Sequence, residues 1–237
     1  MDLRAYSDGD YDFVRSLYLK ALSETSGKAV RNVMFQPRIT RLLSLLLPAA
    51  GYLVFKGLTG MLLWSPGTAY QVTVLSIIFV CLLIFASTYN MFAAGLKKSV
   101  KASFERDMTD IPSSFNLKAT EEGSYYEPTS VSNIWIATYS GERVGFLTVC
   151  KSGAKSCEIR KLAVLQKYRR RGFGEMMVRQ AIQWAKDHDM ETIFSVNIAS
   201  SQIAACELFE KCNFIIAKQK PVVEGFGYLA YSLSLMN

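Results

Sequence analysis

The chain has 237 residues and a formal net charge of +7, half of its residues are hydrophobic, and its mean hydropathy is +0.15. This length accommodates one domain of ordinary size together with a membrane segment, or one large domain, and the hydropathy is high for a soluble protein. A single histidine argues against a metal centre, while the positive charge favours anionic partners such as lipid headgroups or the phosphates of a cofactor.

A long apolar stretch occupies residues 42–96. Its 55 residues carry one charged side chain, Lys56. As a continuous helix the stretch would extend about 82 Å, against roughly 30 Å for the hydrocarbon core of a bilayer, so one crossing does not use it up. A Pro-Gly pair at residues 66 and 67 divides it into residues 42–64 and 69–96, which predicts a membrane hairpin whose second half is the stronger span. A buried helix pair in a soluble protein is the alternative interpretation.

Residues 158–174 run from a strand through a basic, glycine-containing turn into a helix. The period of two in a strand predicts one face formed by Glu158, Arg160, Leu162 and Val164, and another formed by Ile159, Lys161 and Ala163. From Phe173 onward, apolar residues recur at helical spacing. The turn at residues 169–174 therefore directs unpaired backbone N–H groups and the positive helix end at one point. This arrangement predicts a phosphate site.

A further strand and helix follow the turn. Residues 192–196 have the composition of a buried strand, and the apolar face after them predicts a second helix. Asn213 is expected to end this helix in the left-handed conformation, before Phe214 re-enters the core. Earlier in the chain, residues 120–132 look like a loop. The predicted order is strand, phosphate turn, helix, strand, helix, strand.

These residues together resemble the GCN5-related N-acetyltransferase (GNAT) superfamily. Arg169, Gly172 and Gly174 match its pyrophosphate-loop motif, and residues 202–214 are similar to its second acetyl-CoA motif. The long apolar insert, followed by Asp-Met-Thr-Asp-Ile at residues 107–111, is similar to the camello-like N-acetyltransferases. That family includes membrane-bound acetyltransferases for aspartate, for cysteine S-conjugates and for protein lysines.

The resemblance implies an α+β fold of GNAT type, in which a mixed central sheet flanked by helices is interrupted after the first helix by a hydrophobic transmembrane or re-entrant hairpin. Residues 1–41 would supply the first strand and helix, residues 42–96 the hairpin, and residues 97–237 the remainder of the domain. Both flanks of the hairpin then emerge on one side, and both are rich in Lys and Arg, which favours the cytosolic side. An integral membrane protein, with the endoplasmic reticulum as the expected membrane, follows from the same resemblance.

The resemblance also implies how acetyl-CoA is held. Backbone N–H groups of the turn would bind the pyrophosphate. The strand around residues 162–164 would diverge from residues 192–197, so that free backbone groups bind the pantetheine arm. The residues expected to bind acetyl-CoA are Leu162, Ala163, Val164, Arg169, Arg170, Arg171, Gly172, Phe173, Gly174, Asn197, Gln202, Ala205 and Phe209.

Two residues are candidates for the chemistry. The N–H of Val164 is the expected oxyanion donor. Glu158 is the candidate base that removes a proton from the acceptor amine, because it is the carboxylate on the strand beside the cofactor and occupies a place where several relatives carry a base. An ordinary salt bridge from Glu158 to Arg160 or Lys161 is the alternative.

The general acid and the acceptor are less well marked. Phe209 stands where many relatives carry a tyrosine that protonates the departing thiolate, so water, Cys206 or Ser201 would have to replace that hydroxyl. A cationic Lys161 or Arg160 would suit a carboxylate-bearing amine such as an amino acid. A bulky thioether conjugate would instead suit an aromatic edge formed by Tyr125, Tyr126 and Phe226.

The sequence thus predicts a membrane-anchored N-acetyltransferase that transfers the acetyl group of acetyl-CoA to a primary amine. The first expected acceptor is an amino acid or amino-acid conjugate, and a protein lysine is the second. The expected partners are this amine and the lipid bilayer, with no metal and no nucleic acid. Two rival hypotheses are a non-catalytic acetyl-CoA-binding membrane protein, suggested by Phe209, and a membrane-shaping hairpin with a vestigial globular part.

Overall fold

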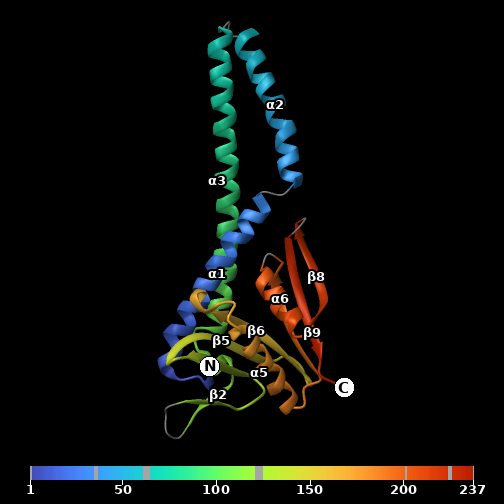
Figure 1. Cartoon of the computed structure of the whole chain (residues 1–237). Helices are drawn as coiled ribbons and strands as arrows, with labels where there is room; N and C mark the ends of the chain where they lie inside the picture. The colour runs from blue at the N-terminus through green and yellow to red at the C-terminus, as the bar shows by residue number, and fades with distance from the viewer. Residues whose placement is uncertain are drawn as a thin grey trace. The chain divides into compact units, whose positions relative to one another are not determined.

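The computed structural model describes residues 2–34, 37–60, 65–120, 125–200, 202–223 and 226–236 (Figure 1). The chain divides into two compact units. The sheet unit comprises Met1–Gly27 and Ser99–Asn237, and the hairpin unit comprises Lys28–Lys98. These two units are defined by contacts within the chain, whereas the boundaries predicted at residues 41 and 96 were defined by composition. The predicted boundaries therefore stay a prediction.

A seven-stranded sheet forms the centre of the sheet unit. Its strands, in spatial order, are β1 (Asp2–Ala5), β4 (Asn133–Tyr139), β5 (Glu142–Lys151), β6 (Ser156–Val164), β7 (Thr192–Ala199), β9 (Phe226–Ser234) and β8 (Ile215–Val223). The pair β6–β7 is parallel and the other pairs are antiparallel. The predicted mixed sheet is therefore confirmed. A separate ribbon pairs β2 (Leu117–Ala119) with β3 (Tyr126–Pro128), so part of the segment predicted as a loop is strand.

Helices cover both faces of this sheet. The helical elements are η1 (Asp8–Asp10), α1 (Tyr11–Met34), α2 (Pro37–Gly60), α3 (Pro66–Asp107), α4 (Ile111–Ser114), η2 (Gln166–Tyr168), α5 (Phe173–Asp187) and α6 (Ile203–Lys211). One hydrophobic cluster joins α5 and α6 to one face of the sheet, and the other joins the first turns of α1 and the segment around α4 to the opposite face. The alternation of β4 divides its residues between them, because Ile134 and Ile136 face α1 whereas Trp135 and Ala137 face α5.

The end of α6 follows the sequence prediction. Asn213 has a φ of 65°, in the left-handed region, and the N–H of Phe214 donates to the carbonyl of Phe209 at 3.0 Å. Phe214 is then buried against the α5 face of the sheet. The expected helix stop at Asn213 is confirmed, because asparagine tolerates this backbone region at little cost.

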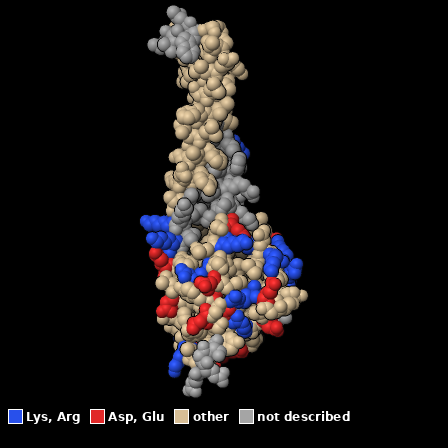
Figure 2. Space-filling model, turned by 90° about the vertical axis from the view of Figure 1, so that its left-hand side faces the viewer, with Lys and Arg blue, Asp and Glu red and all other residues tan. Residues whose placement is uncertain are grey.

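The hairpin unit consists of α2 and the part of α3 before residue 99. The two helices pack through small residues: a Cβ on Gly51 would lie 2.6 Å from Cδ1 of Ile77, and Ala69 and Thr73 are buried. The large apolar side chains of both helices are mostly exposed, among them Leu53 and Leu75. Figure 2 shows few charged atoms on the described part of this unit. Among the described residues, Pro66–Met91 is the one segment long and apolar enough to cross a membrane, with a mean hydropathy of 2.4.

Candidate functional site

Strand β6 has two halves with different neighbours. Its first half, Ser156–Glu158, pairs with Thr192–Phe194 of β7, and the pairing stops there. At the next step the Ser195 hydroxyl donates to the carbonyl of Ile159 at 3.0 Å, in place of a backbone bond. The second half of β6 keeps β5 as its neighbour but has lost β7. The predicted divergence of residues 162–164 from β7 is confirmed, and its apex lies at Ser195.

A β-bulge at Arg160 changes the predicted faces of β6. Thr148 and Val149 on β5 are adjacent, but their partners Lys161 and Ile159 are two residues apart, so Arg160 is the extra residue. Ile159 consequently faces α5, as do Leu162 and Val164 after the bulge. Glu158, Arg160 and Lys161 instead gather on the α1 face, where Ala163 also lies. The prediction that Glu158 and Arg160 share a face with Leu162 and Val164 was wrong, because strict alternation does not hold across a bulge.

Beyond the bulge, the backbone N–H and C=O groups of successive residues point alternately toward β5 and toward the gap left by β7. Leu165 donates its N–H to the carbonyl of Val144 at 2.8 Å. The N–H and C=O of one residue in an antiparallel strand point to the same side, and neighbouring residues point to opposite sides. Ala163 therefore turns its backbone groups to β5, while Leu162 and Val164 turn theirs to the gap. Of the three residues expected to bind the pantetheine arm, Ala163 has its backbone groups committed to the sheet.

The turn before α5 leaves a helix N-terminus open. Gly172 is the N-cap, has a φ of 87°, and provides no side-chain cap. A Cβ on Gly172 would meet no atom within 4 Å, so space lies in front of this position. Arg170 also has a positive φ, of 62°, a conformation that glycine adopts at lower cost than arginine. Gly174 has a different role, because a Cβ there would lie 3.0 Å from Cδ2 of Leu208, so it allows α5 and α6 to pack closely.

The side chains of the basic turn have protein partners. The Arg169 guanidinium donates from Nε to the carbonyl of Val164 at 3.0 Å and from Nη1 to Glu24 of α1 at 2.7 Å. Arg170 pairs with Glu207 of α6 at 2.7 Å. The guanidinium of Arg171 lies 5.6 Å from the ring centroid of Tyr168. Phe173 is buried, and its ring contacts Tyr139 and Tyr168.

The second predicted acetyl-CoA motif lies at the start of α6. Gln202 is the N-cap and Ala205 is partly buried. Phe209 is 3% exposed, and its ring lies 5.1 Å from that of Phe214 and 5.7 Å from that of Tyr231. Its side chain is thus part of the core. The side chain of Asn197 and all of Ser201 lie outside the described residues.

The Tyr231 ring, which carries a hydroxyl, packs against the ring of Phe209, which carries none. Its ring stacks on Phe209 at an interplanar angle of 21°, and its hydroxyl donates to Glu210 at 3.0 Å. Burial, followed by the neighbouring Cys206 and Glu210, raises the pKa of Tyr231, so this hydroxyl keeps its proton at neutral pH. Tyr231 pairs with Ser195, so it lies at the apex of the β6–β7 gap.

The α1 face of β6 carries a charged cluster, termed the β6 cluster, made of Tyr18, Asp107, Glu158, Arg160 and Lys161. Lys161 is buried, lies 3.1 Å from Asp107 and donates to the Tyr18 hydroxyl at 2.8 Å. The contacts of Arg160 are longer, at 3.7 Å to Asp107 and 3.5 Å to Glu158. The alternative of a salt bridge from Glu158 to Arg160 is therefore present, with a separation too long for a strong hydrogen bond.

Two neighbours of the β6 cluster complete this face. Burial raises the pKa of the Cys150 thiol to about 12, so it stays protonated and is a poor nucleophile. The Thr148 hydroxyl is fully buried and has no hydrogen-bond partner within the described part of the chain. Within the same part, no group of three or more His, Cys, Asp or Glu side chains is arranged to hold a metal ion.

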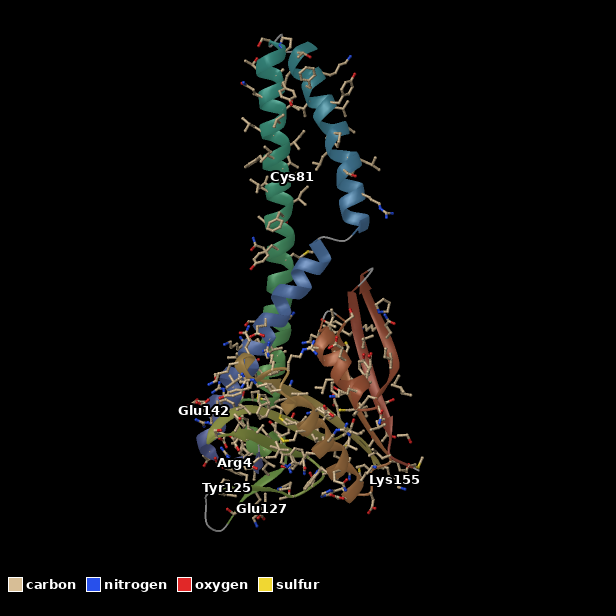
Figure 3. The ribbon with its side chains drawn as sticks, viewed as in Figure 1. Arg4, Cys81, Tyr125, Glu127, Glu142 and Lys155 are labelled. Atoms are coloured by element: carbon tan, nitrogen blue, oxygen red, sulfur yellow. The ribbon has the colours of Figure 1, made fainter. Side chains whose placement is uncertain are left out.

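The predicted aromatic edge does not form as one site. The N–H of Tyr126 donates to the carbonyl of Tyr6 just after β1, and the Tyr126 hydroxyl donates to Asp8. Figure 3 shows Tyr125 beside Arg4 at this end of the sheet. Phe226 begins β9, and four strands separate β1 from β9 in the sheet order, so the three aromatic residues lie apart. The prediction failed because strand order is a non-local property.

Sequence reasoning missed several residues of this site. Tyr18, Glu24, Ser195 and Tyr231 lie within elements whose local pattern gave no sign of function. Tyr18 is 143 positions from its partner Lys161, and Glu24 is 145 positions from Arg169. A single sequence contains no local signal for pairs so far apart, so only the fold identifies them.

The chain is similar in sequence to several known proteins. Residues 101–214 match the model of the Acetyltransferase (GNAT) family. N-acetyltransferase 8F1 of Rattus norvegicus is 28% identical over 192 residues, which cover 78% of this chain and 73% of the relative. N-acetyltransferase family 8 member 3 of the same species is 26% identical over 219 residues, which cover 90% of this chain and 82% of the relative. A solved Bacillus subtilis acetyltransferase in complex with CoA is 24% identical over 44% of this chain and 78% of that one, with a TM-score of 0.41.

Proposed function

We propose, from the premise that this chain is a GNAT-type N-acetyltransferase that uses acetyl-CoA, that its acceptor is an amino acid or amino-acid conjugate and that α2 and α3 anchor it in a membrane. The observation that carries the acceptor proposal is the loose pair of Glu158 and Arg160, 3.5 Å apart on the α1 face of β6. An amino acid carries an ammonium group and a carboxylate on one carbon. Its ammonium can therefore pair with Glu158 while its carboxylate pairs with Arg160.

The residues around the β6–β7 gap fit acetyl-CoA. The first N–H groups of α5 have no side-chain cap, and space lies in front of Gly172, so a diphosphate can approach the helix N-terminus. Leu162 and Val164 turn backbone groups to the gap, which suits the amide groups of a pantetheine arm. When bound, acetyl-CoA supplies an acetyl group as a thioester, which a neutral amine can attack.

Three groups of the protein are proposed to act on the reacting atoms. The N–H of Val164 donates a hydrogen bond to the acetyl carbonyl oxygen and stabilises the negative charge that develops there, an effect worth a few kcal/mol. Glu158 accepts the proton that the acceptor ammonium must lose before it attacks. Tyr231, which pairs with Ser195 at the apex of the gap and whose ring stacks on Phe209, is the replacement proposed for the hydroxyl that Phe209 lacks.

The two cations of the β6 cluster have different roles. Lys161 is buried and holds Asp107 and Tyr18 at short distances, so binding an acceptor would cost it those contacts. The Arg160 side chain is 29% exposed and lies 3.7 Å from Asp107 and 3.5 Å from Glu158, so its guanidinium can turn to the carboxylate of an incoming acceptor. We therefore assign the acceptor carboxylate to Arg160, which is one of the two residues expected from the sequence.

Membrane anchoring is supported by the surface of the hairpin unit. A core helix pair of a soluble protein would be buried, but only 6% of the apolar window in Pro66–Met91 is buried. The exposed Leu, Ile and Phe side chains of α2 and α3 would otherwise contact water. Small residues at the α2–α3 contact, such as Gly51, are typical of helices that pack within a bilayer. Both flanks of the hairpin are basic, which favours a cytosolic catalytic domain, with the endoplasmic reticulum as the proposed membrane.

A panel of amines tests the activity. The purified full chain in detergent is incubated with acetyl-CoA and with amino acids, their carboxamides, cysteine S-conjugates and lysine peptides, and thiol release is measured. We expect the highest kcat/KM for acceptors with a free α-carboxylate. Equal rates for an amino acid and its carboxamide would contradict the assignment of Arg160, and thiol release from the lysine peptide alone would favour a protein acceptor.

Protease protection tests the membrane proposal. A C-terminal tag on the full chain in sealed microsomes should be digested, and carbonate washing should leave the protein in the membrane pellet. A protected tag would place the catalytic domain in the lumen. Release of the protein by carbonate would contradict the anchor itself.

A further inference from the structure

Arg169 connects the catalytic strand to α1 through two hydrogen bonds. Its Nε donates to the carbonyl of Val164 at 3.0 Å, and its Nη1 donates to Glu24 at 2.7 Å. The side chain is 39% exposed and that of Glu24 is 29% exposed, so the pair is partly shielded from water. Both contacts are charge-assisted and within ordinary hydrogen-bond length. The guanidinium therefore bridges two parts of the sheet unit that are far apart in sequence.

The position of this bridge matters because of the direction of Val164. Its N–H and C=O point to the same side of β6, toward the gap left by β7. The last backbone bond between β5 and this end of β6 is the one from Leu165 to Val144. On the gap side, the Val164 carbonyl accepts its hydrogen bond from Arg169. The guanidinium thus restrains the rotation of the residue whose N–H is the proposed oxyanion donor.

Helix α1 is tied to β6 at a second place. Tyr18, six positions before Glu24, accepts a hydrogen bond from Lys161 at 2.8 Å. The two contacts lie on either side of Leu162–Val164 along the chain, since Lys161 precedes this segment and Arg169 follows it. Helix α1 therefore contacts the half of β6 that lacks β7 on both sides of Leu162–Val164. No local feature of Glu24 indicates this role.

We propose that Arg169 and Glu24 are positioning residues for the oxyanion donor, and that the side chain of Arg169 is not a ligand of the cofactor's phosphates. Glu24 fixes the guanidinium, and the guanidinium fixes the Val164 carbonyl, so that its N–H stays directed into the gap. This inference rests on the proposed function, in which Val164 is the donor. It changes the role predicted for Arg169 from the sequence, whose motif match placed it among the cofactor ligands.

Charge-conserving and charge-removing variants separate the two roles. Arg169→Lys keeps the positive charge but loses the planar fork, and Arg169→Gln loses the charge. A positioning role predicts that both lower kcat by about tenfold or more, because small displacements of reacting groups are costly, while the Kd for CoA stays within about threefold. A phosphate ligand predicts the reverse: Arg169→Lys would keep its affinity, and Arg169→Gln would lose affinity with kcat at saturation unchanged. That second result would overturn the proposal.

Substitution of Glu24 tests the same positioning role independently. Glu24→Gln should lower kcat in the same direction without weakening CoA binding, because it removes a carboxylate. The double variant Glu24→Gln with Arg169→Lys should be no slower than Arg169→Lys alone, since the two residues act through one contact. Additive losses would contradict the coupling. Lys167→Gln is the matched control, because Lys167 lies in the same segment and also forms an ion pair of 2.7 Å, but with Glu142 of β5 rather than with α1.

Hydrogen exchange measures the restraint without activity. The peptide covering residues 162–168 should exchange faster in Glu24→Gln and in both Arg169 variants than in the wild type or Lys167→Gln. If the wild type acetylates no amine, the proposed function is wrong. Hydrogen exchange and the Kd for CoA still test whether Arg169 and Glu24 restrain Val164. Unchanged exchange in all variants would overturn the inference even if the enzyme is active.

Discussion

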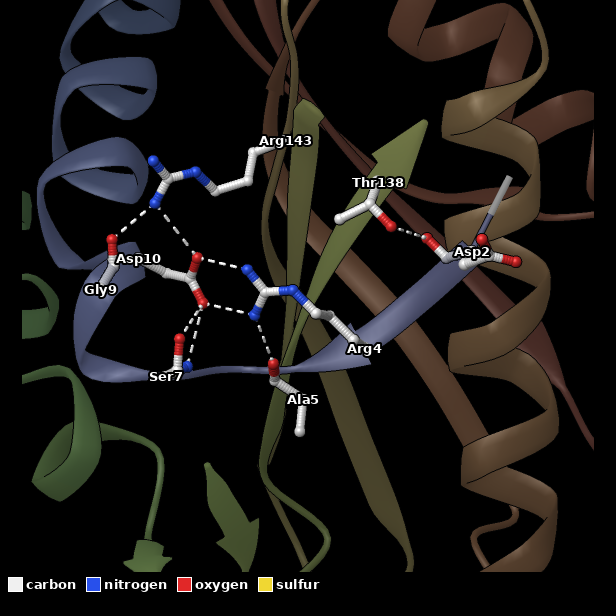
Figure 4. Close-up of polar contacts among 8 residues, drawn as sticks. All are labelled: Asp2, Arg4, Ala5, Ser7, Gly9, Asp10, Thr138 and Arg143. Carbon is white, nitrogen blue, oxygen red and sulfur yellow. Dashed lines mark hydrogen bonds and ion pairs between the residues drawn. The ribbon is translucent and has the colours of Figure 1, made fainter. Parts of the chain in front are cut away.

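Two charged clusters of the sheet unit are built around buried aspartates and differ in how tightly they are held. In the N-terminal cluster, made of Arg4, Ser7, Asp10 and Arg143, the carboxylate of Asp10 accepts two bonds of 2.6 Å from Arg4 and bonds of 2.8 and 3.0 Å from Ser7 (Figure 4). In the β6 cluster, Lys161 lies 3.1 Å from Asp107. The contacts of Arg160 there are 3.5 and 3.7 Å.

The difference separates a structural cluster from one suited to exchange partners. Asp10 is 1% exposed and has its lone pairs occupied by short, charge-assisted bonds that join β1 to the start of α1. Breaking these bonds leaves a buried charge, which is costly. Glu158 and Arg160 have only long contacts with each other, so an incoming ligand loses little when it separates them. Damage to the first cluster should reduce stability, and damage to the second should reduce catalysis.

The largest expected effect is on stability. Asp10→Asn removes the shared carboxylate of the N-terminal cluster and should lower the Tm of the full chain in detergent by about 10 °C, which corresponds to about 3 kcal/mol. The kcat of the folded protein should not change. Asp12→Asn, an exposed residue of α1, is the control. A fall in kcat with an unchanged Tm would erase the distinction between the clusters.

The next effect is on the chemical step. Glu158→Gln should lower kcat by at least about 100-fold if Glu158 is the general base, while the Kd for CoA and the Tm stay unchanged. Glu142→Gln, which alters an exposed glutamate of β5, should leave the rate unaltered. A rate within about threefold of the wild type would mean that Glu158 serves only as an ion pair with Arg160.

A smaller effect should appear in acceptor binding. Arg160→Gln should raise the KM for an amino acid by about tenfold or more, the cost of one charge-assisted hydrogen bond, and should not alter the KM for the matching carboxamide. Arg143→Gln in the N-terminal cluster provides the counterpart and should alter neither KM. Equal changes for the two acceptors would show that Arg160 organises the strand rather than binding the carboxylate.

The smallest effect is the pH dependence of the N-terminal cluster. Burial alone raises the pKa of Asp10, but the hydrogen bonds from Arg4 and Ser7 outweigh it and hold the pKa below its ordinary value. Because the unfolded value is about 3.9, this stabilisation is complete above that pH and is lost as the pH falls through the lower, folded value. The Tm of the wild type should therefore fall more steeply below about pH 4 than that of Asp10→Asn. Parallel curves would contradict this assignment.

The parts of the site that the sequence predicted are those with local causes. The turn at residues 169–174 follows from its glycines, and the helix after it follows from apolar spacing. The stop at Asn213 follows from the tolerance of asparagine for positive φ. The divergence of β6 and β7 was expected from the resemblance to acetyltransferases. Each of these depends on residues within one or two elements.

The parts that the sequence did not predict depend on strand pairing and distant partners. The bulge at Arg160 exists because β6 and β5 pair with one residue of offset, and it places Lys161 on the α1 face together with Glu158 and Arg160. Arg169 was expected to bind phosphate, yet its side chain contacts Glu24 and the carbonyl of Val164. These contacts join positions more than a hundred residues apart, or depend on a register that one sequence does not encode locally.

By itself, the sequence determined that an apolar segment interrupts a domain with a basic, glycine-containing turn, because composition and periodicity act over short stretches of chain. Only the tertiary structure decided which charged side chains contact one another. One extra residue in β6 turns three charged side chains to the same face, and α1 supplies the tyrosine and the glutamate that contact residues on either side of Leu162–Val164. The physical reason is that side-chain direction in a strand follows its register, and register is fixed by the neighbouring strand rather than by the residues themselves.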